Sequence, residues 1–190
     1  KLSQDQLLTD PDQATDFVKK TQVDALAVAI GTSHGAYKFS RQPDGDILAL
    51  NVVKAINKRL PGLHMVMHGS SSVPQELQDI INANGGEMPQ TWGTPVDEIV
   101  EGIKHGVRKV NIDTDCRMAI SGQVRKILLE KKAEFDPRKF TKPATEAMQV
   151  VCESRYEAFG TAGNASKLKP LPLTAMAGRY NSGELEQKIQ

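Results

Sequence analysis

The chain has 190 residues, of which 39% are hydrophobic and 25% are charged, so it can bury a core and is not a disordered polypeptide. Its 24 basic and 23 acidic side chains give a net charge of +1, which removes the usual support for a nucleic-acid or membrane-surface role, and no apolar run reaches the roughly 20 residues of a membrane span. Two cysteines without a C-x-x-C motif indicate a reduced, cytoplasmic protein rather than a disulfide scaffold.

The first expected element is a helix near the start of the chain. Asp10 suits its cap position and Pro11 its first turn, while Phe17 belongs to its expected apolar face. The nearly continuous apolar run over residues 23–30 then predicts a strand covered on both faces, as in a parallel sheet. After a loop, the spacing of apolar residues predicts a helix from about Asp46 to Leu60.

The same order of elements returns twice along the chain. Residues 63–67 predict a second strand, and Pro74 opens the helix that follows. A short helix is expected from Thr94-Pro95 to His105, directly before a third strand over residues 107–112. Strand, loop and helix therefore alternate at intervals of about forty residues, which is typical of right-handed βαβ units.

The C-terminal third is expected to hold two further helices and a tail. One helix is predicted over residues 113–135, and Asp136-Pro137 is expected to break it. Another is predicted over residues 143–159. The prolines and glycines of the last thirty residues predict a mostly irregular tail.

Three parallel strands are few for a complete sheet, whereas eight units of about this size form a (β/α)8 barrel. We therefore expect residues 1–190 to be the C-terminal part of one TIM-barrel domain of class α/β, with about three βα units followed by C-terminal helices and a tail. The chain begins with lysine, and the N-terminal half of the domain is expected to be missing from it.

Each expected strand ends in a polar cluster, and the carboxyl ends of parallel strands meet at one edge of a sheet, where working sites lie. His34 and His68 belong to the first two clusters. Because adjacent strands lie about 4.8 Å apart, the two imidazoles could converge on one metal ion. They could also be two unrelated loop histidines, and a zinc site needs at least three protein ligands.

Glycine, hydroxyl and amide groups in the same clusters suit a phosphate. Gly35, residues 69–71 and residues 111–114 could offer backbone N–H groups and hydroxyls near the start of a helix. Asp113 or Thr114 could instead simply cap that helix, because a carboxylate repels phosphate. None of the clusters matches a P-loop or a G-x-G-x-x-G fingerprint.

Three segments stand out in order and spacing: Gly-Thr-Ser-His-Gly-Ala-Tyr-Lys at 31–38, His-Gly-Ser-Ser at 68–71 and Val-Asn-Ile-Asp-Thr-Asp at 110–115. Together they resemble the C-terminal half of class II fructose-bisphosphate aldolase. The linking residues 85–95 and the tail resemble the bacterial branch often associated with the Calvin cycle. The resemblance implies a zinc-dependent, cytoplasmic homodimer or homotetramer. It implies reversible cleavage of fructose 1,6-bisphosphate to dihydroxyacetone phosphate and glyceraldehyde 3-phosphate, in glycolysis, gluconeogenesis and the Calvin cycle.

The resemblance also implies roles for individual residues. His34 and His68 match two zinc ligands, and a monovalent cation, Na⁺ or K⁺, is expected beside the substrate phosphate. Arg138 resembles the arginine that reaches the other phosphate of a neighbouring subunit's substrate. The positions that match substrate-binding segments are Gly35, Gly69, Ser70, Ser71, Asn111, Ile112, Asp113 and Thr114.

In the family, the remaining zinc ligands and the acid–base carboxylates precede the matched stretch, so the catalytic acid and base are not named here. The segment alone is therefore expected to be inactive. Two alternatives stay open: a tagatose 1,6-bisphosphate aldolase, and a non-catalytic phosphosugar-binding subunit with the same fold. Neither nucleic acid nor a membrane is expected as a partner.

Overall fold

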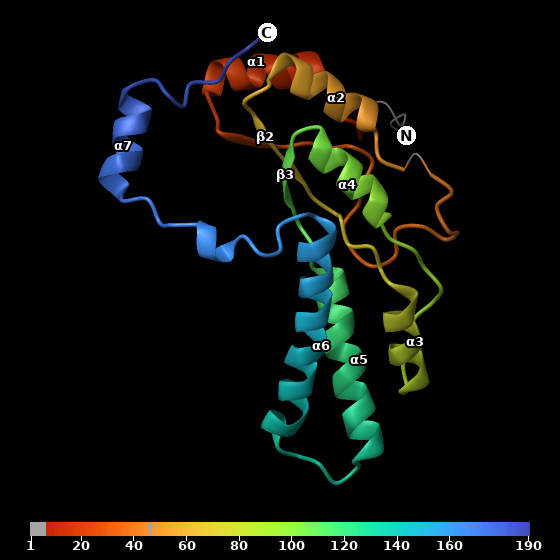
Figure 1. Cartoon of the computed structure of the whole chain (residues 1–190). Helices are drawn as coiled ribbons and strands as arrows, with labels where there is room; N and C mark the ends of the chain where they lie inside the picture. Colours follow the sequence, from red (N-terminus) through yellow and green to blue (C-terminus); the bar gives the residue numbers. More distant parts are fainter. Residues whose placement is uncertain (1–6, 46) are drawn as a thin grey trace.

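The computed structural model describes residues 7–45 and 47–190 and has a small parallel sheet covered by helices (Figure 1). The strands, in their order across the sheet, are β1 (Ala25–Ala27), β2 (His64–Met67) and β3 (Val107–Val110). The helices that precede and connect them are α1 (Pro11–Thr21), α2 (Leu50–Arg59), α3 (Gln75–Ala83) and α4 (Val96–Lys104). The predicted α/β class with a parallel sheet is confirmed.

The register of the strands brings their carboxyl ends to one edge. Leu26 lies opposite Met65, and Met67 lies opposite Val110, with a register shift between Met65 and Val66. The loops that follow the three strands therefore start side by side. This arrangement places the three polar clusters of the sequence at a common edge.

The main core lies between the sheet and the helices α1, α2 and α4. Met65 and Met67 of β2 are completely buried, as are Val53 and Ile56 of α2. Burying a side chain of this size stabilises a protein by about 1.5–3 kcal/mol, so this core fixes the sheet that carries the loops. The remaining buried members are Ala14, Val18, Val28, Ile30, Leu48, Leu60, Leu63, Ile99 and Val107.

The first helix begins as expected, but the first strand is shorter than expected. Asp10 accepts hydrogen bonds from the backbone N–H groups of residues 12 and 13, at 2.9 and 2.8 Å. Phe17 does not join the core, because 48% of it is exposed. The strand ends at Ala27, since Ala29 exchanges hydrogen bonds with Thr9 instead of pairing with β2.

Helix α2 begins at Leu50, later than expected, and the predicted start at Asp46 lies outside the described residues. The segment before it is held by Glu98 of α4. The carboxylate of Glu98 accepts from the backbone N–H groups of Ile47 at 3.1 Å and Leu48 at 2.7 Å. The Glu98 carboxylate thus satisfies two backbone N–H groups just before the helix.

Two long helices, α5 (Thr114–Glu130) and α6 (Pro137–Ala158), pack against each other and extend away from the sheet (Figure 1). Helix α5 ends five residues before the predicted end. The expectation that Asp136-Pro137 only breaks a helix is wrong, because this pair starts α6. Asp136 caps it by accepting from the N–H of residue 138 at 3.0 Å, and Pro143 lies inside the helix rather than at its start.

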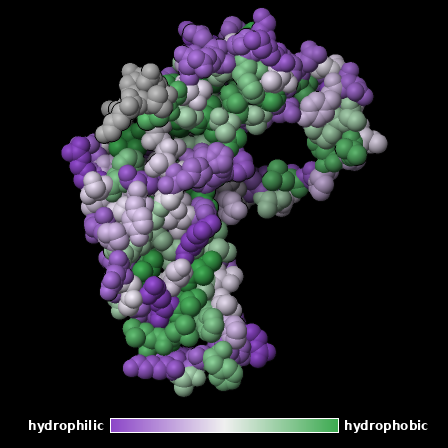
Figure 2. Space-filling view, turned by 180° about the vertical axis from the view of Figure 1, so that it is seen from behind, coloured by the Kyte–Doolittle hydropathy of each residue, from purple (hydrophilic) through white to green (hydrophobic). Residues whose placement is uncertain are grey.

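The prediction of a mostly irregular tail is wrong for residues 173–181. A 3₁₀ turn (Ala165–Lys167) is followed by α7 (Leu173–Asn181), none of whose residues is buried. The chain then returns to α1 and α2, where the N–H of Gln190 donates to the carbonyl of Arg59 at 2.8 Å. Figure 2 shows an opening between this C-terminal arm and the rest of the molecule.

No helix within the described residues is both long and apolar enough for a membrane span.

Candidate metal and phosphate site

The structure brings His34 and His68 together at the carboxyl edge of the sheet. Their ring centroids are 5.4 Å apart, and the ring planes are inclined by 40°. Two imidazoles bound to one tetrahedral zinc ion at about 2.0–2.1 Å have centroids roughly 5 Å apart. The observed spacing therefore suits a shared metal ion with only small side-chain adjustments.

Asn111, which follows β3, completes this corner of the site. Its side-chain nitrogen Nδ2 lies 2.8 Å from Nδ1 and 3.2 Å from Nε2 of His68, so the amide packs against this imidazole. Within residues 7–45 and 47–190, no group of three His, Cys, Asp or Glu side chains is placed to hold a metal ion. The two histidines thus fit part of a zinc site, and these residues do not supply its full ligand set.

Both histidines line a pocket of about 240 Å³ between the three loops. Among the residues predicted from sequence, those that line it are His34, Gly35, His68, Gly69, Ser71, Asn111, Asp113 and Thr114. The pocket is therefore built from all three polar clusters. It lies where parallel α/β proteins place their working sites.

Three predicted residues lie outside this pocket. Ser70 is buried, and its hydroxyl donates to the carbonyl of Met67 at 3.2 Å. Ile112 lines a different pocket, between α5 and α6. Arg138 lies at the start of α6, where its guanidinium pairs with Asp136 at 2.7 Å and its side chain is 89% exposed.

Ser71 caps helix α5 from the neighbouring loop. Its Oγ accepts hydrogen bonds from the backbone N–H groups of Asp113 at 3.1 Å and Thr114 at 3.0 Å. The prediction that Asp113 or Thr114 caps this helix is wrong, because Asp113 occupies the cap position without a side-chain capping bond. The described residues give the hydroxyl proton of Ser71 no acceptor, so this proton can be donated to an anion in the pocket.

Lys38 supplies a positive charge that the sequence reasoning missed. Its ammonium donates to the carbonyl oxygens of Gly69 and Ser71, the latter at 3.1 Å. Burial lowers the pKa of Lys38 from 10.5 to about 8, and the nearby Asp115 carboxylate opposes this shift. The signal in the sequence was its position four residues after His34, as the one basic side chain of residues 31–40.

The two carboxylates beside the pocket are engaged with other groups. Asp113 accepts from Nε of Arg117 at 2.9 Å, which offsets its charge. Asp115 is completely buried and accepts from the backbone N–H groups of Ser72 and Val73. On sequence grounds, these carboxylates are expected to repel a phosphate. Their contacts with other groups reduce that repulsion.

The backbone of the second loop is specialised. Gly69 has φ +64°, and a Cβ atom there would lie 2.5 Å from the carbonyl oxygen of Ser33, so only glycine lets the first two loops touch. Val73 has φ +50° although it is β-branched and precedes Pro74. A strained backbone conformation of this kind costs on the order of 1–3 kcal/mol of folding free energy, so contacts with neighbouring residues must stabilise it.

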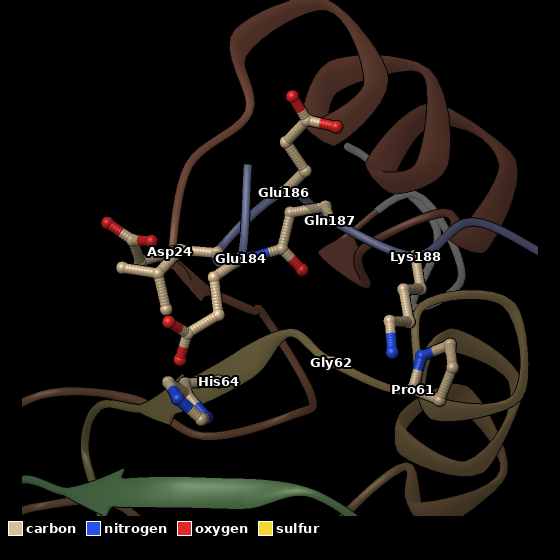
Figure 3. A pocket seen from close by; sticks show the side chains of 9 residues that line it. Asp24, Pro61, Gly62, His64, Glu184, Glu186, Gln187 and Lys188 are labelled. Carbon is tan, nitrogen blue, oxygen red and sulfur yellow. The ribbon is translucent and has the colours of Figure 1, made fainter. Parts of the chain in front are cut away.

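A larger pocket, of about 340 Å³, opens at the opposite, amino end of the strands. Asp24, His64 and residues 184–188 contribute to its lining (Figure 3). Figure 3 shows the carboxylate of Glu184 directed toward His64. Because working sites of parallel α/β sheets lie at the carboxyl ends, the smaller pocket with the paired histidines is the candidate site.

The fold and this pocket define a parallel α/β protein with a paired-histidine corner and a polar cradle for an anion. The family described as "Fructose-bisphosphate aldolase class-II" matches residues 1–164. The chain therefore belongs to the class II fructose-bisphosphate aldolase family. This confirms the resemblance seen in the three sequence segments.

Curated relatives of this chain carry the same description. It is 70% identical over 188 residues to "Fructose-bisphosphate aldolase 2" of Cereibacter sphaeroides, covering 99% of this chain and 53% of the relative. It is 61% identical over 188 residues to "Fructose-bisphosphate aldolase" of Pseudomonas aeruginosa, with the same coverage. The chain spans about half the length of the curated relatives it matches.

Solved structures agree on the fold. The YdjI aldolase from Escherichia coli K12 aligns with a TM-score of 0.57 and 27% identity, over 83% of this chain and 48% of that one. A putative fructose-1,6-biphosphate aldolase from Coccidioides immitis aligns with a TM-score of 0.55 and 24% identity, over 85% and 46%. The second likeness supports the fold alone.

Proposed function

We propose that residues 1–190 form the C-terminal part of one barrel domain of a class II aldolase. The full-length polypeptide would cleave fructose 1,6-bisphosphate reversibly to dihydroxyacetone phosphate and glyceraldehyde 3-phosphate, in the cytoplasm. The observation that carries this proposal is the pocket in which His34 and His68 lie beside Lys38 and Ser71. A metal corner and a phosphate cradle in one pocket suit a phosphorylated ketose.

His34 and His68 would hold a zinc ion together with ligands from outside the described residues. When bound, the metal supplies Lewis-acid polarisation of the substrate's ketone oxygen. Asn111 would restrain the imidazole of His68 by packing against it. A catalytic acid and base are not assigned to any residue of this pocket.

The phosphate of the ketose would lie against Lys38 and Ser71. The Lys38 ammonium offers charge, the Ser71 hydroxyl offers a proton, and the segments at Gly35 and Thr114 complete the lining. Holding the phosphate fixes the reacting carbonyl relative to the metal, which lowers the entropic part of the barrier. The expected monovalent cation, Na⁺ or K⁺, stays a proposal without a defined position, because the Lys38 ammonium already occupies the carbonyls of Gly69 and Ser71.

The test is a cleavage assay on the full-length polypeptide with fructose 1,6-bisphosphate and, separately, tagatose 1,6-bisphosphate. We expect cleavage of the fructose ester, loss of activity with a chelator, and recovery on adding zinc. Preference for the tagatose ester would favour the alternative aldolase. Phosphate binding without turnover of either ester would favour the non-catalytic alternative. The isolated segment 1–190 should show no turnover with added zinc.

We also propose that the enzyme is a homodimer or homotetramer in which Arg138 reaches the substrate of a neighbouring subunit. Its exposed side chain on the protruding α5–α6 pair supports this role. Arg138→Ala should raise the KM for fructose 1,6-bisphosphate without changing the oligomer size in sedimentation. An unchanged KM in an intact oligomer would contradict the role.

A further inference from the structure

Asp115 and Arg155 form an ion pair directly behind the phosphate pocket, without lining it. Asp115 lies in the first turn of α5 and is 0% exposed, and Arg155 reaches it from α6. The guanidinium Nη2 lies 3.2 Å from the Asp115 carboxylate and 2.6 Å from the hydroxyl oxygen of Ser72. Burying two charges costs desolvation free energy, so the contacts of Asp115 and Arg155 should show what this pair does in the fold.

Those contacts end on the loop that follows β2. Asp115 accepts from the backbone N–H of Ser72 at 3.0 Å, from the Ser72 hydroxyl at 3.1 Å and from the backbone N–H of Val73 at 2.8 Å. Three bonds from one carboxylate thus fix two consecutive residues. The second of them is Val73, the buried residue with the left-handed φ of +50°.

The same loop carries the phosphate-facing groups. Ser71 precedes the two fixed residues, caps α5 through its hydroxyl and accepts from Lys38 through its carbonyl. If the segment at Val73 relaxed to an extended conformation, the Ser71 hydroxyl and the carbonyl that positions Lys38 would move together. The conformation of Val73 therefore determines the geometry of the cradle.

We propose that Asp115 and Arg155 are positioning residues that hold the loop of residues 71–73 in a strained conformation and so preorganise the phosphate pocket. The inference rests on the proposed function of that pocket. Arg155 orients the carboxylate, and the carboxylate restrains the backbone. Preorganised donors bind an anion more tightly because they do not have to be ordered when it arrives.

The test uses the full-length polypeptide with its metal bound. Asp115→Asn replaces one acceptor oxygen by an amide that faces N–H donors, so the loop should lose its restraint. We expect the Kd for inorganic phosphate, measured by calorimetry, and the KM for fructose 1,6-bisphosphate to rise by about tenfold, with kcat changing less and the zinc content unchanged. The matched control is Glu98→Gln, since Glu98 also accepts from two backbone N–H groups, on a segment that does not line the pocket. It should lower the Tm without changing KM.

Val73→Gly separates positioning from simple stabilisation. Glycine adopts a positive φ without strain, so a loop with glycine at 73 needs less restraint. In that background, Asp115→Asn should raise the phosphate Kd by less than about threefold, as a double-mutant cycle would show. Equal Kd increases in both backgrounds would contradict control through Val73.

Two outcomes would overturn the proposal. One is an Asp115→Asn protein with a lower Tm but an unchanged phosphate Kd, which would leave Asp115 a purely structural residue. If this variant fails to fold, Arg155→Lys carries the test, because lysine keeps the charge but loses the two-point contact with Asp115 and Ser72. An unchanged phosphate Kd in that variant is the second outcome. Failure of the proposed function would appear separately, as an inactive wild-type protein.

Discussion

The loops at the carboxyl edge of the sheet and the C-terminal arm (residues 165–190) are both rich in polar and turn-forming residues, yet they are held very differently. The loops are cross-linked by side chain–backbone bonds, such as Thr32 Oγ1 to the carbonyl of His68 at 2.7 Å and Ser71 Oγ to the start of α5. Helix α7 in the arm buries no residue, and Leu173 is 85% exposed. Apolar surface on the arm is visible in Figure 2.

The difference indicates where rigidity is used. In the proposed site, the groups that would meet a ligand are already restrained, whereas the arm is attached by a few contacts such as Tyr180 Oη to Asp24 at 2.6 Å. Substitutions in the loops should therefore change metal or substrate binding with modest effects on folding. Substitutions in the arm should change neither ligand binding nor folding stability, as long as no partner covers the arm.

The largest effect is expected for the paired histidines. His34→Ala or His68→Ala in the full-length polypeptide should remove bound zinc and lower kcat/KM for fructose 1,6-bisphosphate on the order of a thousandfold. Metal analysis and the cleavage assay measure the two effects. The control is His64→Ala, at the amino end of β2, where activity should stay within about twofold of wild type. Zinc retained by either site variant would contradict the shared ion.

Lys38 should give the next largest effect, together with a characteristic pH dependence. Lys38→Met should raise the KM for fructose 1,6-bisphosphate by about 10–100-fold, because a charged hydrogen bond to the phosphate is lost. The pKa of Lys38 is lowered to about 8, so the ammonium is present below pH 8 and is lost as the pH rises through it. In wild type, kcat/KM should therefore fall above about pH 8, since it reports the free enzyme.

The control for this profile must allow for the other ionisable groups that face the pocket. Asp113 and the two histidines line the pocket, and Asp115 lies near Lys38 without lining it. All four are present in both proteins, so only the decline above pH 8 should disappear in Lys38→Met. Lys126→Met, at an exposed position of α5, should keep the wild-type profile. A decline above pH 8 that persists in Lys38→Met would assign it to another group.

The smallest effect is expected in the arm. Leu173→Ser should change the free energy of unfolding by no more than about 0.5 kcal/mol, whereas Ile56→Ala in the core should cost about 2–5 kcal/mol. Thermal unfolding of the full-length variants measures both. A large loss for Leu173→Ser would mean that another chain segment or a second subunit covers the arm.

The parts of the fold that could be predicted from sequence are those with strong local patterns. The apolar run at residues 63–67 and the cap at Asp10 needed no tertiary information. Asp136-Pro137 has the same local chemistry as Asp10-Pro11, but the sequence pattern also fits a break after a long helix; in the structure α5 already ends at Glu130 and the pair starts α6. Only the packing of α5 against α6 decides between these outcomes.

In the candidate site, too, some features could be predicted from local sequence and others depend on tertiary contacts. The placement of His34 and His68 follows from parallel strands ending at one edge. The cap of α5 could not be predicted locally, because Ser71 lies 42 residues before Asp113. The lowered pKa of Lys38 depends on burial by other loops, which no local sequence pattern encodes.

The central claim is that one pocket holds both a metal and a phosphate between the loops that follow the three strands. Its most direct test is a crystal structure of the full-length polypeptide soaked with zinc and inorganic phosphate, with anomalous data at the zinc edge. We expect one zinc peak about 2.0–2.1 Å from imidazole nitrogens of both His34 and His68, and a phosphate within about 3 Å of Lys38 Nζ and Ser71 Oγ. A zinc ion at the opposite end of the sheet, beside Asp24, His64 and Glu184, or a phosphate away from the three loops, would contradict the claim.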